Sequence, residues 1–189
     1  LALGLTLGLI SGYYGKAIAF SILRLMDLLL AFPNILLAIV VIAILGPGLN
    51  NVIIAVGISA TPTFTRVIYG SVLSLKENDY IDAARMVGAS HTRIIMKHIL
   101  PNVIAPVIVM FTLQVGAAIF AASSLSFIGL GAQPPTPEWG AMVSRGRNML
   151  RNAMWISTFP GLAISIVVIS INVFGDGLRD VLDPKSRIR

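Results

Sequence analysis

Long apolar segments separated by short polar ones dominate this chain. A helix needs about 20 apolar residues to cross roughly 30 Å of hydrocarbon. Four segments approach or exceed that length and are predicted to span a membrane, at about residues 18–45, 52–69, 103–122 and 155–174. A further apolar run, residues 1–11, is too short to cross alone. We predict that it is the end of a span that begins before Leu1, so that the chain is truncated at its N-terminus.

Charged and helix-breaking residues are few inside these apolar segments. Arg24 and Asp27 lie three residues apart, a spacing that lets two side chains of one helix neutralise each other. Arg66 comes near the end of its span, where its long side chain can reach water. A kink is expected at Pro33, because proline has no N–H to donate. Residues 11–16 are expected to form a turn.

One polar interval between two predicted spans has a specific order of residues. Asp79 is a candidate helix N-cap, with Asp82 three residues later in the capping-box position. Gly88 is suited to end this helix in a left-handed conformation. Ser90 is a candidate cap for a second helix, which is expected to break or kink at Pro101. The pattern therefore predicts two short helices between two spans.

The first of these short helices carries a narrow apolar stripe. Tyr80, Ala83, Ala84 and Val87 recur at the i, i+3, i+4 and i+7 positions of one helical face. Because the middle of the stripe is alanine, it suits close approach to another surface better than a core of its own. An amphipathic helix lying at the membrane surface is the plainer alternative. We favour a docking element.

The same interval resembles the "EAA" loop of ABC-importer permeases. The family pattern is Glu-Ala-Ala, three residues, Gly, nine residues, Ile, any residue and Leu-Pro. The residues that match this pattern are Ala83, Ala84, Gly88, Leu100 and Pro101. Asp82 stands in place of Glu and keeps the negative charge, whereas His98 occupies the Ile position and alters one packing contact.

Segments outside this interval extend the resemblance over essentially the whole chain. They include GYYG, RLMDLLLAFP, LGPGLNN, SLSFIGLGAQPPTPEWGAMVSRGRN, WISTFPG and GDGLRDVLDP. They resemble the dipeptide, oligopeptide and nickel group of ABC-importer permeases, and within it the second of two paired permease subunits. The resemblance implies an all-α fold, a polytopic transmembrane helix bundle of the type I ABC-importer kind. Residues 1–189 would form this single permease domain, with a cytoplasmic coupling loop at 74–101 that contains a short coupling helix.

The resemblance also implies a function and a set of partners. The chain would translocate peptides, or a related solute such as a nickel chelate or a glutathione-like compound, by alternating access. Its partners would be a homologous second permease subunit, two cytoplasmic ABC ATPase subunits, an extracytoplasmic solute-binding protein and the lipid bilayer, with no nucleic acid. The residues expected to couple to the ATPases are Tyr80, Asp82, Ala83, Ala84, Val87, Gly88, Leu100 and Pro101.

One polar residue in the spans is a candidate for the substrate path. Gln114 lies near the middle of the segment 103–122. A glutamine in that position more often forms a hydrogen bond between helices, so both roles stay open.

The distribution of positive charge predicts the orientation in the membrane. Hydrophobic residues make up 56% of the chain and charged residues 12%, against about 25% charged residues in soluble domains. Ten lysines and arginines fall on the side of the turn near residue 16, the loop 74–101 and the C-terminus, and three fall on the other side. The positive-inside rule then places the loop and the C-terminus in the cytoplasm, in a multi-pass protein of the cell (inner) membrane.

The chain shows no sign of chemistry of its own. It contains no cysteine. Gly15-Lys16 fails as a phosphate-binding loop, because Ile10 and Ala17 occupy positions that require Gly and Ser or Thr. His91 and His98 would lie about 10 Å apart along a helix, too far to share a metal ion. We therefore expect no enzyme, no metal and no cofactor in this chain, with ATP bound by partner subunits.

A secondary carrier or a channel, not powered by ATP, is the alternative function. A carrier is expected to have ionisable residues facing a site at the membrane midplane, and often inverted halves. The sequence indicates neither feature. This alternative would also leave the two-helix polar interval without a role.

Overall fold

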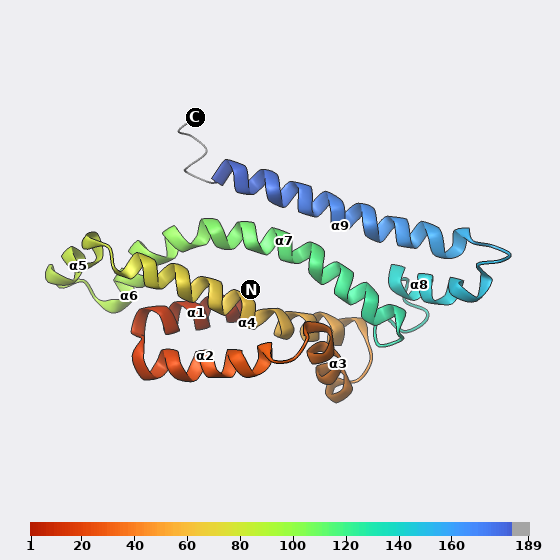
Figure 1. Cartoon of the computed structure of the whole chain (residues 1–189), viewed down its shortest axis with the longest axis horizontal. Coiled ribbons are helices and arrows are strands. Elements are labelled where there is room, and N and C mark those ends of the chain that lie inside the picture. Colours follow the sequence, from red (N-terminus) through yellow and green to blue (C-terminus); the bar gives the residue numbers. More distant parts are fainter. Residues whose placement is uncertain (183–189) are drawn as a thin grey trace. The chain divides into compact units, whose positions relative to one another are not determined.

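The computed structural model describes residues 1–182, and every regular element in that range is helical (Figure 1). This agrees with the predicted all-α class. The last seven residues, part of the charge count above, lie outside the described range. The chain forms two compact units, one made of residues 1–32 and 60–108 and the other of residues 33–59 and 109 onward. Two long helices, α4 (Leu49–Lys76) and α7 (Leu100–Phe127), contribute to both units.

The first unit begins with an antiparallel pair of helices, α1 (Ala2–Tyr14) and α2 (Lys16–Leu30). The expected turn at residues 11–16 is wrong in extent. Helix α1 continues to Tyr14, and the chain reverses at Gly15 and Lys16, whose φ angles are 62° and 49°. Two successive residues with positive φ turn the backbone out of the helical path and so reverse the chain.

Helix α1 packs tightly against α4 through three glycines (Figure 1). A Cβ atom added at Gly8 would lie 2.6 Å from Cβ of Ile68, closer than any real contact. Gly4 meets Phe64 and Gly12 meets Val72 in the same way; these pairs repeat every four residues on both helices. Small residues at this spacing let two membrane helices approach each other closely.

The rest of the first unit is the connection between α4 and α7. It contains α5 (Asp79–Met86), α6 (His91–Ile94) and the π-helix η1 (Ile95–Ile99). The helix does not break at Pro101, because η1 leads directly into α7, and the alternative of a kink there stays a prediction. A π-turn widens the helix just before the position where the proline ring would collide with a carbonyl group. The Asn102 side chain donates a hydrogen bond to the His98 carbonyl over 2.7 Å.

The second unit contains α3 (Asn34–Leu45), the first part of α4, most of α7, α8 (Trp139–Gly146), η2 (Arg147–Met149) and α9 (Trp155–Leu182). Its buried apolar cluster joins α3, α4 and α7 and consists of Ala38, Ile42, Val52, Ala55 and Leu125. Helices α8 and α9 pack as a hairpin. The Ser157 hydroxyl of α9 donates to the Val143 carbonyl of α8 over 3.2 Å, which ties the hairpin together.

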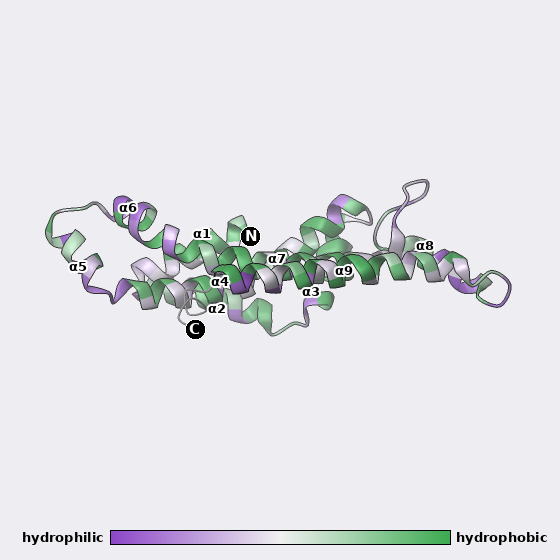
Figure 2. Ribbon diagram, turned by 90° about the horizontal axis from the view of Figure 1, so that it is seen from above, coloured by the Kyte–Doolittle hydropathy of each residue, from purple (hydrophilic) through white to green (hydrophobic). Residues whose placement is uncertain are grey.

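Three helical stretches are long and apolar enough to cross a membrane: Leu49–Lys76, His91–Phe127 and Trp155–Leu182. Helices α2 and α3 pass the same test only as a broken pair, interrupted before Asn34 by Pro33 in an extended conformation. The helices extend beyond the predicted spans 52–69, 103–122 and 155–174. Hydrophobic residues cover α1, α4, α7 and α9, and hydrophilic ones gather around α6 (Figure 2). How many times the chain crosses the membrane stays a prediction.

Candidate functional site

The polar connection between α4 and α7 is the most distinctive part of the first unit. Asn78, not Asp79, is the N-cap of α5: its backbone is extended, and its side chain donates to the carbonyl of Leu75 at the end of α4 over 3.0 Å. Asp79 is therefore the first helical residue, where its negative charge interacts favourably with the positive end of the helix dipole. Asp82 forms no capping box. It accepts a hydrogen bond from Arg85 over 2.9 Å, in a solvent-exposed pair of the weak kind.

The end of α5 has the conformation expected from the sequence. Gly88 has φ of 83°. Its N–H donates to the Arg85 carbonyl over 2.9 Å, and the N–H of Ala89 donates to the Ala84 carbonyl over 3.0 Å. These two bonds form a Schellman motif, which satisfies carbonyls at the end of the helix. The predicted cap of α6 is confirmed too, since the Ser90 hydroxyl accepts from the N–H of Arg93 over 3.3 Å.

Helix α5 has a buried side and an exposed apolar side. Ile81 is fully buried and fastens the helix to the rest of the unit. On the opposite side Met86 and Val87 are 86% and 89% exposed, Tyr80 is 43% exposed and Ala83 is exposed. We call these four residues, Tyr80, Ala83, Met86 and Val87, the docking face. Ala84 is half-buried at the border between the two sides.

The structure brings only part of the predicted coupling set to this face. Leu100 and Pro101 belong to the first turn of α7, where Leu100 is half-buried and Pro101 exposed. Leu100 and Pro101 therefore belong to the start of α7 and not to the docking face. Tyr80 of α5 contacts the other end of this polar segment, since its ring centroid lies 6.4 Å from that of His98 in η1.

Tyr13, at the end of α1, holds the connection in place. Its hydroxyl lies 2.8 Å from Nδ1 of His91, the first residue of α6, and its carbonyl accepts from Nζ of Lys76 at the end of α4 over 2.7 Å. The Tyr13 side chain is nearly inaccessible, at 4% exposed. Above its ring lies the Arg85 guanidinium of α5, 5.9 Å from the centroid. The Lys76 Nζ lies 5.8 Å from the same centroid, so this one side chain contacts α4, α5 and α6.

Sequence reasoning missed this arrangement. Tyr13 fell within the expected turn, and His91 was considered as a metal ligand and rejected in that role. Neither residue carries a local pattern that points to the other, because 78 positions separate them. The only available signal was that a buried tyrosine hydroxyl usually finds a hydrogen-bond partner.

A charged pair lies farther along the same unit. Arg66 of α4 forms a salt bridge and hydrogen bond with Asp27 of α2. The expected pairing of Arg24 with Asp27 is therefore wrong. The Arg24 guanidinium lies 5.4 Å from the ring centroid of Phe20 on its own helix. The ion pair holds Arg66 beside α2, with its side chain 52% exposed, and the expectation that it reaches water stays a prediction.

Gln114 lies in the second unit, half-buried on α7. Within residues 1–182 its side chain makes no hydrogen bond, so it does not tie two helices of this unit together. The proposed role in the path stays a prediction.

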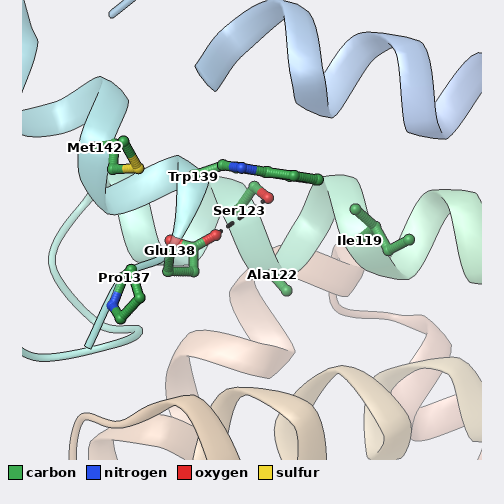
Figure 3. Close-up of a pocket in the computed structure, with 7 residues that line it drawn as sticks. All are labelled: Ile119, Ala122, Ser123, Pro137, Glu138, Trp139 and Met142. Carbon is green, nitrogen blue, oxygen red and sulfur yellow. Dashed lines mark hydrogen bonds between the residues drawn. The ribbon is translucent and has the colours of Figure 1, made fainter. Parts of the chain in front are cut away.

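The second unit also contains a pocket beside the start of α8 (Figure 3). Its volume is about 450 Å³, and it is lined by Ile119, Ala122, Ser123, Pro137, Glu138, Trp139 and Met142. Both carboxylate oxygens of Glu138 are engaged: one accepts from the N–H of Ala141 over 2.8 Å and the other from the Ser123 hydroxyl over 3.4 Å. Glu138 therefore caps α8, and the pocket presents a mostly apolar lining.

The fold defines a multi-pass helical membrane protein with a short helix, outside its long apolar helices, that carries an exposed apolar face. The chain belongs to the family of binding-protein-dependent transport system inner membrane components, whose sequence model matches residues 4–188. This confirms the family to which the sequence motifs pointed.

Individual relatives agree with that assignment. The chain is 52% identical over 187 residues to the dipeptide transport system permease protein DppC of Alkalihalophilus pseudofirmus, covering 99% of this chain and 62% of that protein. It is 49% identical over 183 residues to the glutathione transport system permease protein GsiD of Pectobacterium atrosepticum, covering 97% and 61%. The chain thus spans about three fifths of the length of these relatives.

A solved structure has the same fold. The chain matches a chain of the MetNI methionine ABC transporter, in inward-facing conformations, with a TM-score of 0.73 and 19% sequence identity. The match covers 96% of this chain and 88% of that one. This likeness confirms the fold that the sequence predicted.

Proposed function

We propose that this chain is a membrane-spanning permease subunit of an ATP-driven ABC importer for peptides or glutathione-like peptide derivatives. The observation that carries the proposal is the docking face of α5, which is apolar and exposed on a short helix outside the long apolar helices. The family supports it, as do relatives named for dipeptide and glutathione transport.

The docking face has the properties of a helix that fits a groove on an ATPase subunit. Burying a side chain the size of valine or methionine stabilises a complex by about 1.5–3 kcal/mol. Met86 and Val87 are almost fully available for such burial. Ala83 lies between Tyr80 and Val87 on the same face, and its small side chain lets the helix backbone approach the groove closely.

Movement of α5 would reach the membrane helices through Tyr13. When ATP closes the two ATPase subunits, α5 is displaced with the groove that holds it. The contacts of Tyr13 with His91, Lys76 and Arg85 then transmit the displacement to α1 and α4. The helices of the first unit would thereby alternate between two arrangements, because only different contacts in the two states can drive such a change.

The proposal assigns four kinds of partner to the chain: a homologous second permease, two ATPase subunits that bind ATP, a solute-binding protein and lipid. The chain itself performs no chemistry in this mechanism. The loop 74–101 and the C-terminus would lie in the cytoplasm, on the side of the ATPases. The Pro-rich segment before α8 would lie on the opposite side, facing the solute-binding protein.

The test is reconstitution of the full-length protein with its partner subunits in liposomes. Uptake of radiolabelled dialanine and of glutathione is measured with the cognate binding protein, with and without ATP. We expect the ATPase subunits to co-purify with the permease and uptake to require ATP. Uptake that continues without ATP, from a preparation free of ATPase subunits, would contradict the proposal.

One observation favours the alternative of a secondary carrier, namely the Asp27–Arg66 pair inside the apolar helices. A carrier of this kind would respond to an ion gradient. The experiment above separates the two functions when an ionophore is added: collapse of the gradients would abolish uptake by a carrier and leave ATP-driven uptake intact. The exposed docking face has no role in the carrier, which is why we favour the importer.

A further inference from the structure

The Asp27–Arg66 pair lies well inside the first unit, far from the helix ends beside the α1–α2 turn. Asp27 comes 11 residues after Lys16, where α2 begins, and Arg66 comes ten residues before Lys76, where α4 ends. At about 1.5 Å per residue, both side chains start some 15 Å from these helix ends. Lys76 bonds to the Tyr13 carbonyl beside the α1–α2 turn, so the two ends lie at one level. Half the thickness of a hydrocarbon core of roughly 30 Å is also about 15 Å. With these helix ends at the membrane surface, the pair therefore lies near the membrane midplane.

The pair is also open to the outside of the unit. The Asp27 side chain is 38% exposed and the Arg66 side chain 52% exposed. Charged groups at this depth are costly against lipid and usually face a water-filled cavity or other polar groups. The open side of the pair therefore faces a polar space.

We propose that Asp27 and Arg66 form a binding site for the charged ends of a peptide with free termini. The inference rests on the proposed function, because it takes the polar space to be the translocation path. A carboxylate such as Asp27 binds an ammonium group, and the planar guanidinium of Arg66 binds a carboxylate through two parallel hydrogen bonds. Dipeptides and glutathione both carry one free α-amino group and free carboxylates.

The exchange of partners explains why a pair suits a transport path. Without substrate, Asp27 and Arg66 neutralise each other. With substrate, the peptide ammonium binds Asp27 and the peptide carboxylate binds Arg66, so that every charge keeps an opposite partner. Release restores the original pair. The site therefore binds a zwitterion, and in the empty state neither charge is left unpaired. A peptide that lacks one charged end would leave one residue of the pair without an opposite charge.

The experiment compares the wild-type complex with Asp27→Asn, with Arg66→Gln and with the double variant, in the reconstituted system described above. Dialanine and glutathione are the probes, and co-purification of all subunits measures assembly. Loss of a charged hydrogen-bonding partner typically weakens binding about tenfold or more. We expect all three variants to assemble and their uptake of both probes at low concentration to fall by that factor. Arg24→Gln, which removes a charge from the same helix, should transport normally.

A purely structural pair gives a different result, because Asn and Gln can hydrogen-bond to each other across the same interface. Wild-type uptake by the assembled double variant would overturn the inference. To separate loss of binding from loss of folding, Asp27→Cys is treated with a charged thiol reagent. Reaction that dialanine slows supports the site, whereas absence of reaction shows a covered pair and overturns it. Failure of the wild-type complex to transport either probe would instead overturn the proposed function.

Discussion

The Tyr13 hydroxyl lies 2.8 Å from Nδ1 of His91, and this bond joins the end of α1 to the start of α6. Both residues belong to the first unit. Tyr13 also receives a hydrogen bond from Lys76 on its carbonyl group. Displacement of α5 and α6 therefore acts on α1 and α4 through one buried side chain. The first prediction concerns this bond.

Tyr13→Phe removes the hydroxyl and keeps the ring. We expect a small loss of stability, about 0.5–1.5 kcal/mol, because one hydrogen bond is lost. Transport per ATP hydrolysed should fall several-fold, since the loop moves without α1. Both rates are measured in the reconstituted complex. Tyr14→Phe is the control, because Tyr14 is 47% exposed and its hydroxyl makes no hydrogen bond within residues 1–182. Unchanged coupling in Tyr13→Phe would show that the bond transmits nothing.

Gly88→Val should detach the ATPase subunits while leaving the membrane helices intact. Valine at φ of 83° costs about 1–2 kcal/mol or more, so the Schellman motif and the end of α5 would be lost. Among residues 1–182 no atom lies within 4 Å of the added Cβ, so the cost is conformational. Gly88→Asn is the matched control, because asparagine tolerates this conformation. Normal membrane levels with loss of ATPase co-purification are expected for Gly88→Val alone; equal co-purification of both variants would refute the role of the turn.

Val87→Asp separates docking from folding. Val87 is 89% exposed, and surface substitutions usually change stability by about 0.5 kcal/mol or less. The charge should nevertheless prevent burial against a partner, so co-purified ATPase is expected to fall at least tenfold at unchanged yield. Ile81→Ala, on the buried side of the same helix, should lower stability by about 2–5 kcal/mol. Retained ATPase binding in Val87→Asp would mean that the docking face lies elsewhere.

Gly8→Val should separate α1 from α4. Even the first carbon of the new side chain would lie 2.6 Å from Ile68, so the helices must move apart, at a cost of about 1–3 kcal/mol or more. We expect a lower thermal unfolding midpoint in detergent and a lower yield. Gly70→Ala is the control on α4, where an added Cβ meets no atom within 4 Å. A midpoint for Gly8→Val equal to that of the control would contradict the packing of α1 on α4.

The orientation can be tested with single cysteines, since the sequence contains none. Ser90 and Gln133 are both exposed, so a cysteine at either position can be reached by a reagent. A membrane-impermeant thiol reagent applied to intact cells should label Gln133→Cys and leave Ser90→Cys unlabelled until the cells are opened. The reverse pattern would invert the proposed topology and place the docking face away from the ATPases.

Features that depend on neighbouring residues were predictable from the sequence. Gly88 ends α5 and Ser90 caps α6 as expected, because caps involve groups within a few residues of each other. The neighbouring cap was misplaced by one residue, from Asn78 to Asp79. Helix boundaries fray at this scale, and both residue types are good caps.

Features that join distant segments were not predictable in the same way. Asp27 had a partner at the right spacing on its own helix, Arg24, and the structure pairs it with Arg66 instead. The glycines at positions 4, 8 and 12 were given no role from the sequence, and the structure shows that they pack α1 closely on α4. The spacing of residues along a helix determines the face on which each residue lies. Which helix packs against that face depends on the whole fold.

The sequence by itself determined the class of this protein, its helices and the motif of its family, since apolar length, helix caps and a fixed order of residues are properties of a linear chain. The tertiary structure decided which residues work together. It left Met86 and Val87 exposed, brought Tyr13 to His91 and opened the Asp27–Arg66 pair to one side. These outcomes follow from packing, in which each helix can bury only one face and the remaining faces are left for partners, lipid or substrate.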